Sequence, residues 1–212
     1  MEDSLPRFDE LFISRFADLV RWRRDVRRFR HDPVAGDLLE TIIQFASLSP
    51  SVGYSQPWRF ISVRDANSRL AIRSNFLKSN KAALDAYEGE RAALYAQLKL
   101  AGLDDAPEHL AVFCDMETDA GQGLGRQTMP EMLEYSAVIA VHTLWLAARM
   151  YGLGVGWVSI LDPSEVKRVL DAPSGWKLIA YLCVGYPQEE HLDPELARHS
   201  WEQYRKPAIL VR

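Results

Sequence analysis

A long apolar stretch, from about Ala137 to Trp157, limits what this chain can fold into. It contains His142, Arg149 and several glycines, which make it a poor membrane span. Its residues instead predict a buried helix that starts at Pro130 and runs to about residue 151, followed directly by a strand. The stretch therefore indicates a globular core in which one long helix leads into a sheet.

Three glycines, Gly152, Gly154 and Gly156, separate this helix from the strand. A dinucleotide-binding glycine motif follows a strand and opens a helix, and the order here is the reverse. The glycines fit better as a helix C-cap that runs into a strand approaching something flat and close, because a residue without Cβ permits that approach. No GxSxG elbow marks Ser159 as a hydrolase nucleophile, and a serine at a strand end is more often solvated or bonded to backbone.

Helix and strand signals continue along the chain without repeats or linkers, so residues 1–212 are expected to form one domain. Helices are expected over about 9–22, 37–48, in one or two pieces over 66–100, and after Asp162-Pro163, where Glu165 provides a capping acid. Strands are expected at about 58–64, 110–114, 155–160 and 177–186. The tail over 187–212 is too small to stand alone, and we expect it to wrap around a partner subunit.

Charge and composition exclude several functions. The net charge is -4, with 29 acidic and 25 basic residues, which argues against general nucleic-acid binding. The five histidines lack metal-ligand spacing, so they are expected on the surface or in the core, with no metal site. Cys114 and Cys183 each lie in an apolar segment, which indicates buried thiols. The first residues lack a secretory pattern, so we expect a cytoplasmic protein that does not bind a membrane.

Six arginines fall between Arg21 and Arg30. Guanidinium groups present fixed forks of donors that suit phosphate oxygens, so this density predicts an anion site. Asp25 lies among them. It either forms a simple ion pair with Arg24 or Arg28, or it is a proton-transfer group held beside the bound anion. For the arginines themselves, a solvated basic face and a nucleic-acid patch are the alternatives.

Four segments, in this order, resemble the flavin nitroreductase superfamily over about residues 21–201. They are Arg23-Arg24-Asp25-Val26-Arg27, Pro50-Ser51-Val52-Gly53 with Gln56-Pro57-Trp58, Gly89-Glu90-Arg91 through Leu98-Lys99-Leu100, and Gly152-Leu153-Gly154-Val155-Gly156-Trp157-Val158-Ser159. The resemblance implies an α+β fold with a central mixed or antiparallel sheet flanked by helices. It also implies a domain-swapped homodimer with FMN at the subunit interface.

The resemblance further implies which residues contact FMN. The arginine segment would hold the phosphate and ribityl chain, a loop and a helical insert would line the flavin, and the end of a strand would lie near the isoalloxazine. The residues at these motif positions are Arg23, Arg24, Asp25, Val26, Arg27, Ser51, Gly53, Arg91, Leu100 and Ser159.

Asp25 separates two branches of this superfamily. Ordinary nitroreductases resemble Arg-Arg-Ser-x-Arg here, which leaves the flavin face open for a second substrate. An aspartate, with a helical lid over residues 70–103, resembles the branch in which reduced FMN is itself the substrate. That branch uses dioxygen to fragment reduced FMN into 5,6-dimethylbenzimidazole, the lower ligand of cobalamin, and erythrose 4-phosphate.

In that reading Asp25 and Ser159 are the catalytic residues. Asp25 would act as a general acid or base, which typically raises the rate by about 100-fold to 10,000-fold. Ser159 would hydrogen-bond near the reacting edge of the flavin. The lid would exclude water, so a separate flavin reductase would supply the reduced FMN. The alternative is an NAD(P)H-dependent FMN nitroreductase with an open flavin face.

Overall fold

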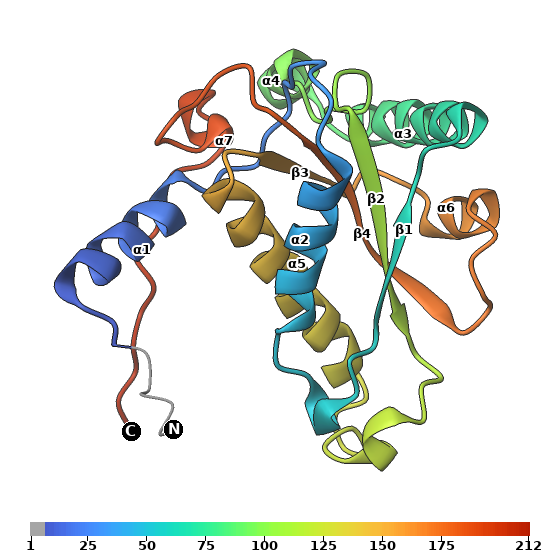
Figure 1. Cartoon of the computed structure of the whole chain (residues 1–212). Coiled ribbons are helices and arrows are strands. Elements are labelled where there is room, and N and C mark those ends of the chain that lie inside the picture. Colours follow the sequence, from blue (N-terminus) through green and yellow to red (C-terminus); the bar gives the residue numbers. More distant parts are fainter. Residues whose placement is uncertain (1–6) are drawn as a thin grey trace.

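A four-stranded sheet with the order β1-β2-β4-β3 forms the centre of the computed structural model, which describes residues 7–212 (Figure 1). The strands are β1 (Trp58–Ser62), β2 (Glu108–Asp115), β3 (Gly154–Val158) and β4 (Trp176–Gly185). The ladders β1/β2, β2/β4 and β3/β4 are all antiparallel. The predicted α+β class with a sheet flanked by helices is therefore confirmed.

Successive residues of β2 face two different helical layers, because side chains alternate across a strand. Leu110, Val112 and Cys114 belong to the core beneath α2 (Gly36–Ser47) and α5 (Met132–Met150). Ala111 and Phe113 belong to a second core beneath α3 (Ala66–Asp85) and α6 (Pro163–Val169). Figure 1 shows α2 and α5 on one side of the sheet and α3 and α6 on the other.

The predicted buried helix is α5, which begins at Met132 rather than at Pro130. It places a row of small and branched residues against the sheet, and these are Ala137, Ala140, Val141, Leu144 and Ala148. Across residues 7–212, no helix is long and apolar enough to span a bilayer.

Local capping sets most of the remaining boundaries. Asp162 Oδ1 accepts hydrogen bonds from the N–H groups of Ser164 and Glu165, so α6 begins where the sequence predicted it. The expected helical region over 66–100 consists of α3 and a short α4 (Gly89–Gln97). The shorter helical pieces are η1 (Val52–Tyr54), η2 (Ala120–Gly123) and α7 (Glu195–Arg198). The third strand ends at Val158, two residues earlier than expected, which leaves Ser159 outside it.

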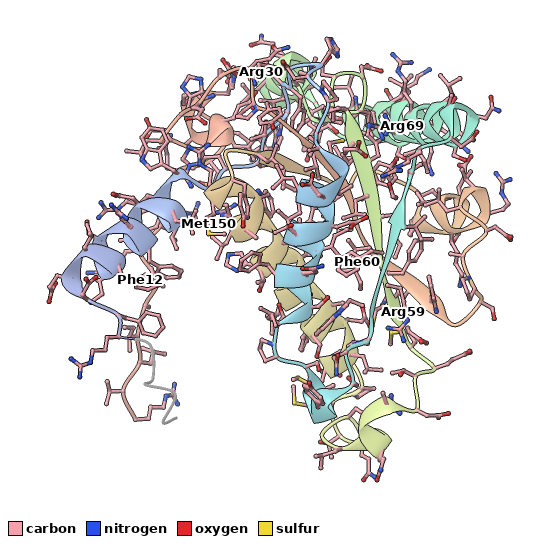
Figure 2. All side chains as sticks on the ribbon, viewed as in Figure 1. Phe12, Arg30, Arg59, Phe60, Arg69 and Met150 are labelled. Atoms are coloured by element: carbon pink, nitrogen blue, oxygen red, sulfur yellow. The ribbon has the colours of Figure 1, made fainter. Side chains whose placement is uncertain are left out.

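The first helix, α1 (Glu10–Trp22), projects from the body on the same side as the end of the chain (Figure 1). It has no buried residue, although Leu11, Phe12, Phe16 and Val20 are large and apolar. Figure 2 shows Phe12 on this projecting helix. An isolated helix of this length is only marginally stable in water. The apolar face of α1 is therefore expected to pack against another surface.

Candidate functional site at the edge of strand β3

Residues 23–30, which we call the arginine segment, lie along the edge of β3 that β4 does not occupy. Asp25 pairs with Val155 as an isolated parallel bridge, and the Val26 N–H donates to the Val155 carbonyl at 3.0 Å. Phe29 pairs with Pro187, just after β4. The segment is therefore fixed to the sheet at two points, which holds the side chains between them in place.

The glycines of β3 make this contact possible. A Cβ on Gly156 would lie 2.1 Å from the carbonyl oxygen of Val26, and a Cβ on Gly154 would lie 2.7 Å from a methyl group of the same residue. Both distances are below van der Waals contact, so neither position has room for a larger residue. The glycine pattern did predict a close approach, and the neighbour that approaches is the chain's own segment.

Both carboxylate oxygens of Asp25 are engaged. Oδ1 accepts a hydrogen bond from the Trp157 N–H at 2.9 Å, and Oδ2 accepts one from Arg27 Nε at 2.8 Å. The ion pair is therefore with Arg27, and the alternative interpretation, a simple ion pair with Arg24 or Arg28, is wrong. In extended backbone, residues two apart project to the same side, which brings Asp25 and Arg27 together. The Asp25 side chain is 33% exposed, so it is oriented but still accessible to a ligand.

Arg23 and Arg24 form a like-charged pair that suits an anion. Burial and then the charge of Arg23 lower the pKa of the Arg24 guanidinium. The Arg23 guanidinium lies 4.9 Å from the ring centroid of Trp145 and has no side-chain hydrogen bond to any other part of residues 7–212. A phosphate at this position would offset the repulsion between the two guanidinium groups. These residues fit the phosphate that the sequence predicted for the segment.

The chain that follows α4 packs directly on the arginine segment. Arg27 Nη1 donates to the carbonyl of Lys99 at 3.1 Å. Gly102 lies so close to Phe29 that a Cβ would come within 2.3 Å of the aromatic ring. Leu100 lies between these two contacts and is half-buried. The structure therefore places the chain around Leu100 beside the arginine segment, and the contact of Leu100 with a flavin stays a prediction.

Arg91 and Ser159 are more exposed. The Arg91 guanidinium lies 4.7 Å from the ring centroid of Trp201, a residue of the C-terminal segment. Ser159 follows β3 directly, and its hydroxyl has no hydrogen-bond partner within the described residues. Since Ser159 comes two residues after Trp157, whose N–H binds Asp25, the two expected catalytic residues belong to the same end of the sheet.

Ser51 and Gly53 lie elsewhere in the same chain. The loop that carries them is attached to the start of α5, where the Val52 N–H donates to Ser136 Oγ at 3.0 Å. The arginine segment contacts the same helix nine residues later, where Trp145 Nε1 donates to the Arg24 carbonyl at 3.2 Å. Nine residues of helix correspond to about 14 Å and two and a half turns, so the two contacts lie on opposite faces of α5. Ser51 and Gly53 therefore do not converge with the arginines within one chain.

Gly53 instead contacts the glycine loop at η2. Its backbone has a φ of +57°, and a Cβ there would lie 2.9 Å from the Leu124 carbonyl oxygen and 3.1 Å from that of Gly121. A recess of about 680 Å³ opens beside these residues. Most of the expected flavin contacts thus divide into an arginine group at one end of α5 and a loop group, Ser51 and Gly53, at the other, while Arg91 lies against Trp201.

The arginine segment also binds the C-terminal segment, which the sequence did not predict. Arg28 Nη1 donates to Glu189 at 3.1 Å and to Glu195 at 3.0 Å, two acids of the C-terminal segment. Arg24 Nε also reaches this segment, at the Leu192 carbonyl. The interpretation of the arginines as a solvated basic face is therefore wrong for Arg24, Arg27 and Arg28. The signal in the sequence was the presence of several acidic residues in the tail, which could balance the basic run.

The fold, with an arginine segment on its sheet edge, defines the class of protein. The family model described as "Nitroreductase family" matches residues 20–186, and the chain belongs to this family.

Its relatives narrow the class further. The chain is 53% identical over 207 residues to the 5,6-dimethylbenzimidazole synthase of Rhodospirillum rubrum, with 98% of each chain covered. It is 44% identical to the enzyme of the same name from Rhodobacter capsulatus, over 92% of this chain and 95% of that one. Among solved structures, iodotyrosine deiodinase bound to FMN and 3-iodo-L-tyrosine superposes with a TM-score of 0.72 and 26% identity, over 92% of this chain and 97% of the other.

Proposed function

We propose that this chain is a 5,6-dimethylbenzimidazole synthase, which converts reduced FMN and dioxygen into 5,6-dimethylbenzimidazole and erythrose 4-phosphate. The observation that carries the proposal is the 53% identity, over nearly the full length of both chains, to a relative of that name. Asp25, held at the sheet edge by Trp157 and Arg27, supplies the group that such chemistry requires. With one dioxygen consumed per reduced FMN, the atoms balance when the third product is the pyrimidine ring of the flavin carrying both oxygen atoms of that dioxygen.

Each residue of the arginine segment has a separate task in this proposal. Arg23 and Arg24 bind the FMN phosphate, because neither guanidinium forms a salt bridge with a carboxylate among residues 7–212, and the hydrogen bonds of Arg24 go only to backbone carbonyls. Arg27 orients the Asp25 carboxylate and fixes the insert through Lys99. Asp25 accepts protons from the ribityl carbon or the ring nitrogens, and Ser159 hydrogen-bonds near the reacting edge. Reduced FMN supplies both the electrons and the carbon skeleton.

The proposed active unit is a homodimer. Ser51 and Gly53 lie on the far side of α5 from the arginines, so a second copy of the chain is needed to bring both groups to one FMN. The apolar residues of α1 are exposed, and Tyr135, Val138 and Ile139 of α5 are also exposed. Association of two copies would cover these surfaces. Residues 188–201 pack on their own chain, so α1 and the last residues, 202–212, are the parts of the termini that would reach the partner.

We also propose that a separate flavin reductase supplies the reduced FMN. The insert after α4 lies directly on the arginine segment, through Lys99 and Gly102, and so covers the same edge of the sheet. A covered flavin has little room for a nicotinamide above its ring. An open face, by contrast, would suit the alternative function, an NAD(P)H-dependent nitroreductase.

A single turnover tests the proposed function. Anaerobic protein is loaded with chemically reduced FMN and exposed to dioxygen, and the small-molecule products are separated and identified. We expect 5,6-dimethylbenzimidazole and erythrose 4-phosphate. Quantitative recovery of oxidised FMN would contradict the synthase, and rapid flavin reduction by NAD(P)H would then favour the nitroreductase.

In the same assay, Asp25→Asn identifies the proton-transfer group. The amide keeps an acceptor for the Trp157 N–H but removes the charge, so we expect product formation to fall about 100-fold or more while FMN still binds. Asp32→Asn is the matched control, since Asp32 is exposed and its one salt bridge within residues 7–212 is with Arg30. Wild-type product yield from Asp25→Asn with FMN bound would remove Asp25 from the mechanism.

A further inference from the structure

The C-terminal residues 188–201, which we call the strap, connect the arginine segment to α4. At one end, the Gln188 N–H donates to the Arg28 carbonyl at 3.0 Å, and the Gln188 side chain donates to the Phe29 carbonyl at 2.7 Å. Arg28 binds Glu195, whose side chain is only 9% exposed. This end of the strap is therefore fixed to the same residues that lie beside the proposed phosphate site.

At its other end the strap inserts Trp201 against α4. The Trp201 ring meets Tyr87 edge-on at a centroid distance of 5.6 Å and lies 6.1 Å from Tyr95. The Arg91 guanidinium covers the same indole at 4.7 Å. Trp201 therefore contacts three side chains of the predicted lid, Tyr87, Arg91 and Tyr95.

The lid helix depends on such contacts to keep its position. It has nine residues, no side-chain N-cap, and a single buried residue, Tyr95. A helix this short is not stable in water by itself, so tertiary contacts must hold it. Tyr95 is anchored on its other side by a hydrogen bond from its hydroxyl to Asn80 Oδ1 at 2.7 Å, which leaves the strap as the second support.

We propose that Trp201 is a positioning residue that locks α4 over the flavin site, and that the strap joins this lock to the arginine segment. The proposal deepens the proposed function and rests on it for its catalytic consequence. With the lock released, water would reach the reduced flavin. The two electrons and two protons of reduced FMN would then pass to dioxygen and give oxidised FMN and hydrogen peroxide in place of ring fragmentation.

Trp201→Ala in the full-length, FMN-bound protein tests the lock. We expect backbone amides of α4 to exchange with deuterium roughly tenfold faster, because aromatic and cation–π contacts are lost. Amides of β2 and β4 serve as an internal reference for global unfolding and should not change. Trp201→Phe should restore much of the protection. Tyr204→Ala removes an exposed aromatic residue from the same tail and should leave α4 unaffected.

The catalytic arm measures products from a single turnover of the same variants. We expect Trp201→Ala to lower the ratio of 5,6-dimethylbenzimidazole to hydrogen peroxide about tenfold, and Trp201→Phe to recover it. Unchanged α4 exchange in Trp201→Ala, or equal acceleration in Tyr204→Ala, would overturn the lock. If the wild type made no 5,6-dimethylbenzimidazole, the proposed function would fail, and the exchange experiment would still decide whether Trp201 holds α4.

Discussion

At the scale of single residues, His109 and Tyr181 form a buried polar pair in the core under α3. His109 Nδ1 and the Tyr181 hydroxyl lie 2.9 Å apart, and His109 Nε2 has no hydrogen-bond partner in the described part of the chain. Burial, followed by the charge of Arg69, lowers the pKa of His109 to about 4. The spacing of the histidines predicts surface or core residues and not metal ligands, but only the packing shows that His109 is the buried one.

This histidine makes stability depend on pH. The pKa of His109 in the folded protein lies below its unfolded value of about 6.5, because the buried ring is held neutral. The stability that depends on this neutral ring is fully present above pH 6.5 and is lost as the pH falls toward 4. Between pH 7 and pH 5 the expected loss is about 2 kcal/mol, measured from urea unfolding at each pH. His109→Gln should flatten this dependence, and an unchanged slope in that variant would assign the pH effect to other groups.

The periodic helices and strands were predictable from the sequence, and the pairing of the arginine segment with the sheet was not. The apolar patterns of α2, α5 and the four strands depend on neighbouring residues, so their bounds fall within a few residues of prediction. The pairing of Asp25 with Val155 joins residues far apart in the chain, which no local pattern encodes. Gly156 was the one hint, because its missing Cβ indicated a close approach before the neighbour was known.

Gly156→Ala tests this element contact. The new Cβ would collide with the Val26 carbonyl, a backbone atom that cannot rotate away, so we expect a loss of about 3 kcal/mol in unfolding free energy and weaker FMN binding. Gly36→Ala at the start of α2 is the control, because nothing lies within 4 Å of its added Cβ. It should be neutral or slightly stabilising. Equal denaturant midpoints for the two variants would refute the close contact.

At the scale of the whole molecule, the site predicted from the sequence is divided between two ends of α5. Sequence motifs identify Ser51 and Gly53 together with the arginines, but they do not say which chain supplies each group. Val52 contacts α5 at Ser136, and Arg24 contacts it at Trp145, nine residues later. The loop group and the arginine group therefore lie at different heights and on opposite faces of the helix. The family resemblance implies a homodimer with FMN at the subunit interface, and the separation of the two groups within one chain supports the proposal that two copies combine to form the site.

Phe12 and Phe16 provide the test of that assembly, since their rings stack at 6.2 Å on α1 and are 46% and 49% exposed. Charges there cannot disturb the core, because α1 buries no residue in the single chain. We expect the double variant Phe12→Asp/Phe16→Asp to sediment as a monomer and to lose FMN affinity at least tenfold, since the loop group would no longer reach the arginines. Leu70→Asp, at an exposed apolar residue of α3, should remain dimeric and bind FMN normally.

A double variant that dimerises like the wild type would show that the interface does not involve α1. A monomeric double variant that binds FMN with full affinity would show that one chain completes the site.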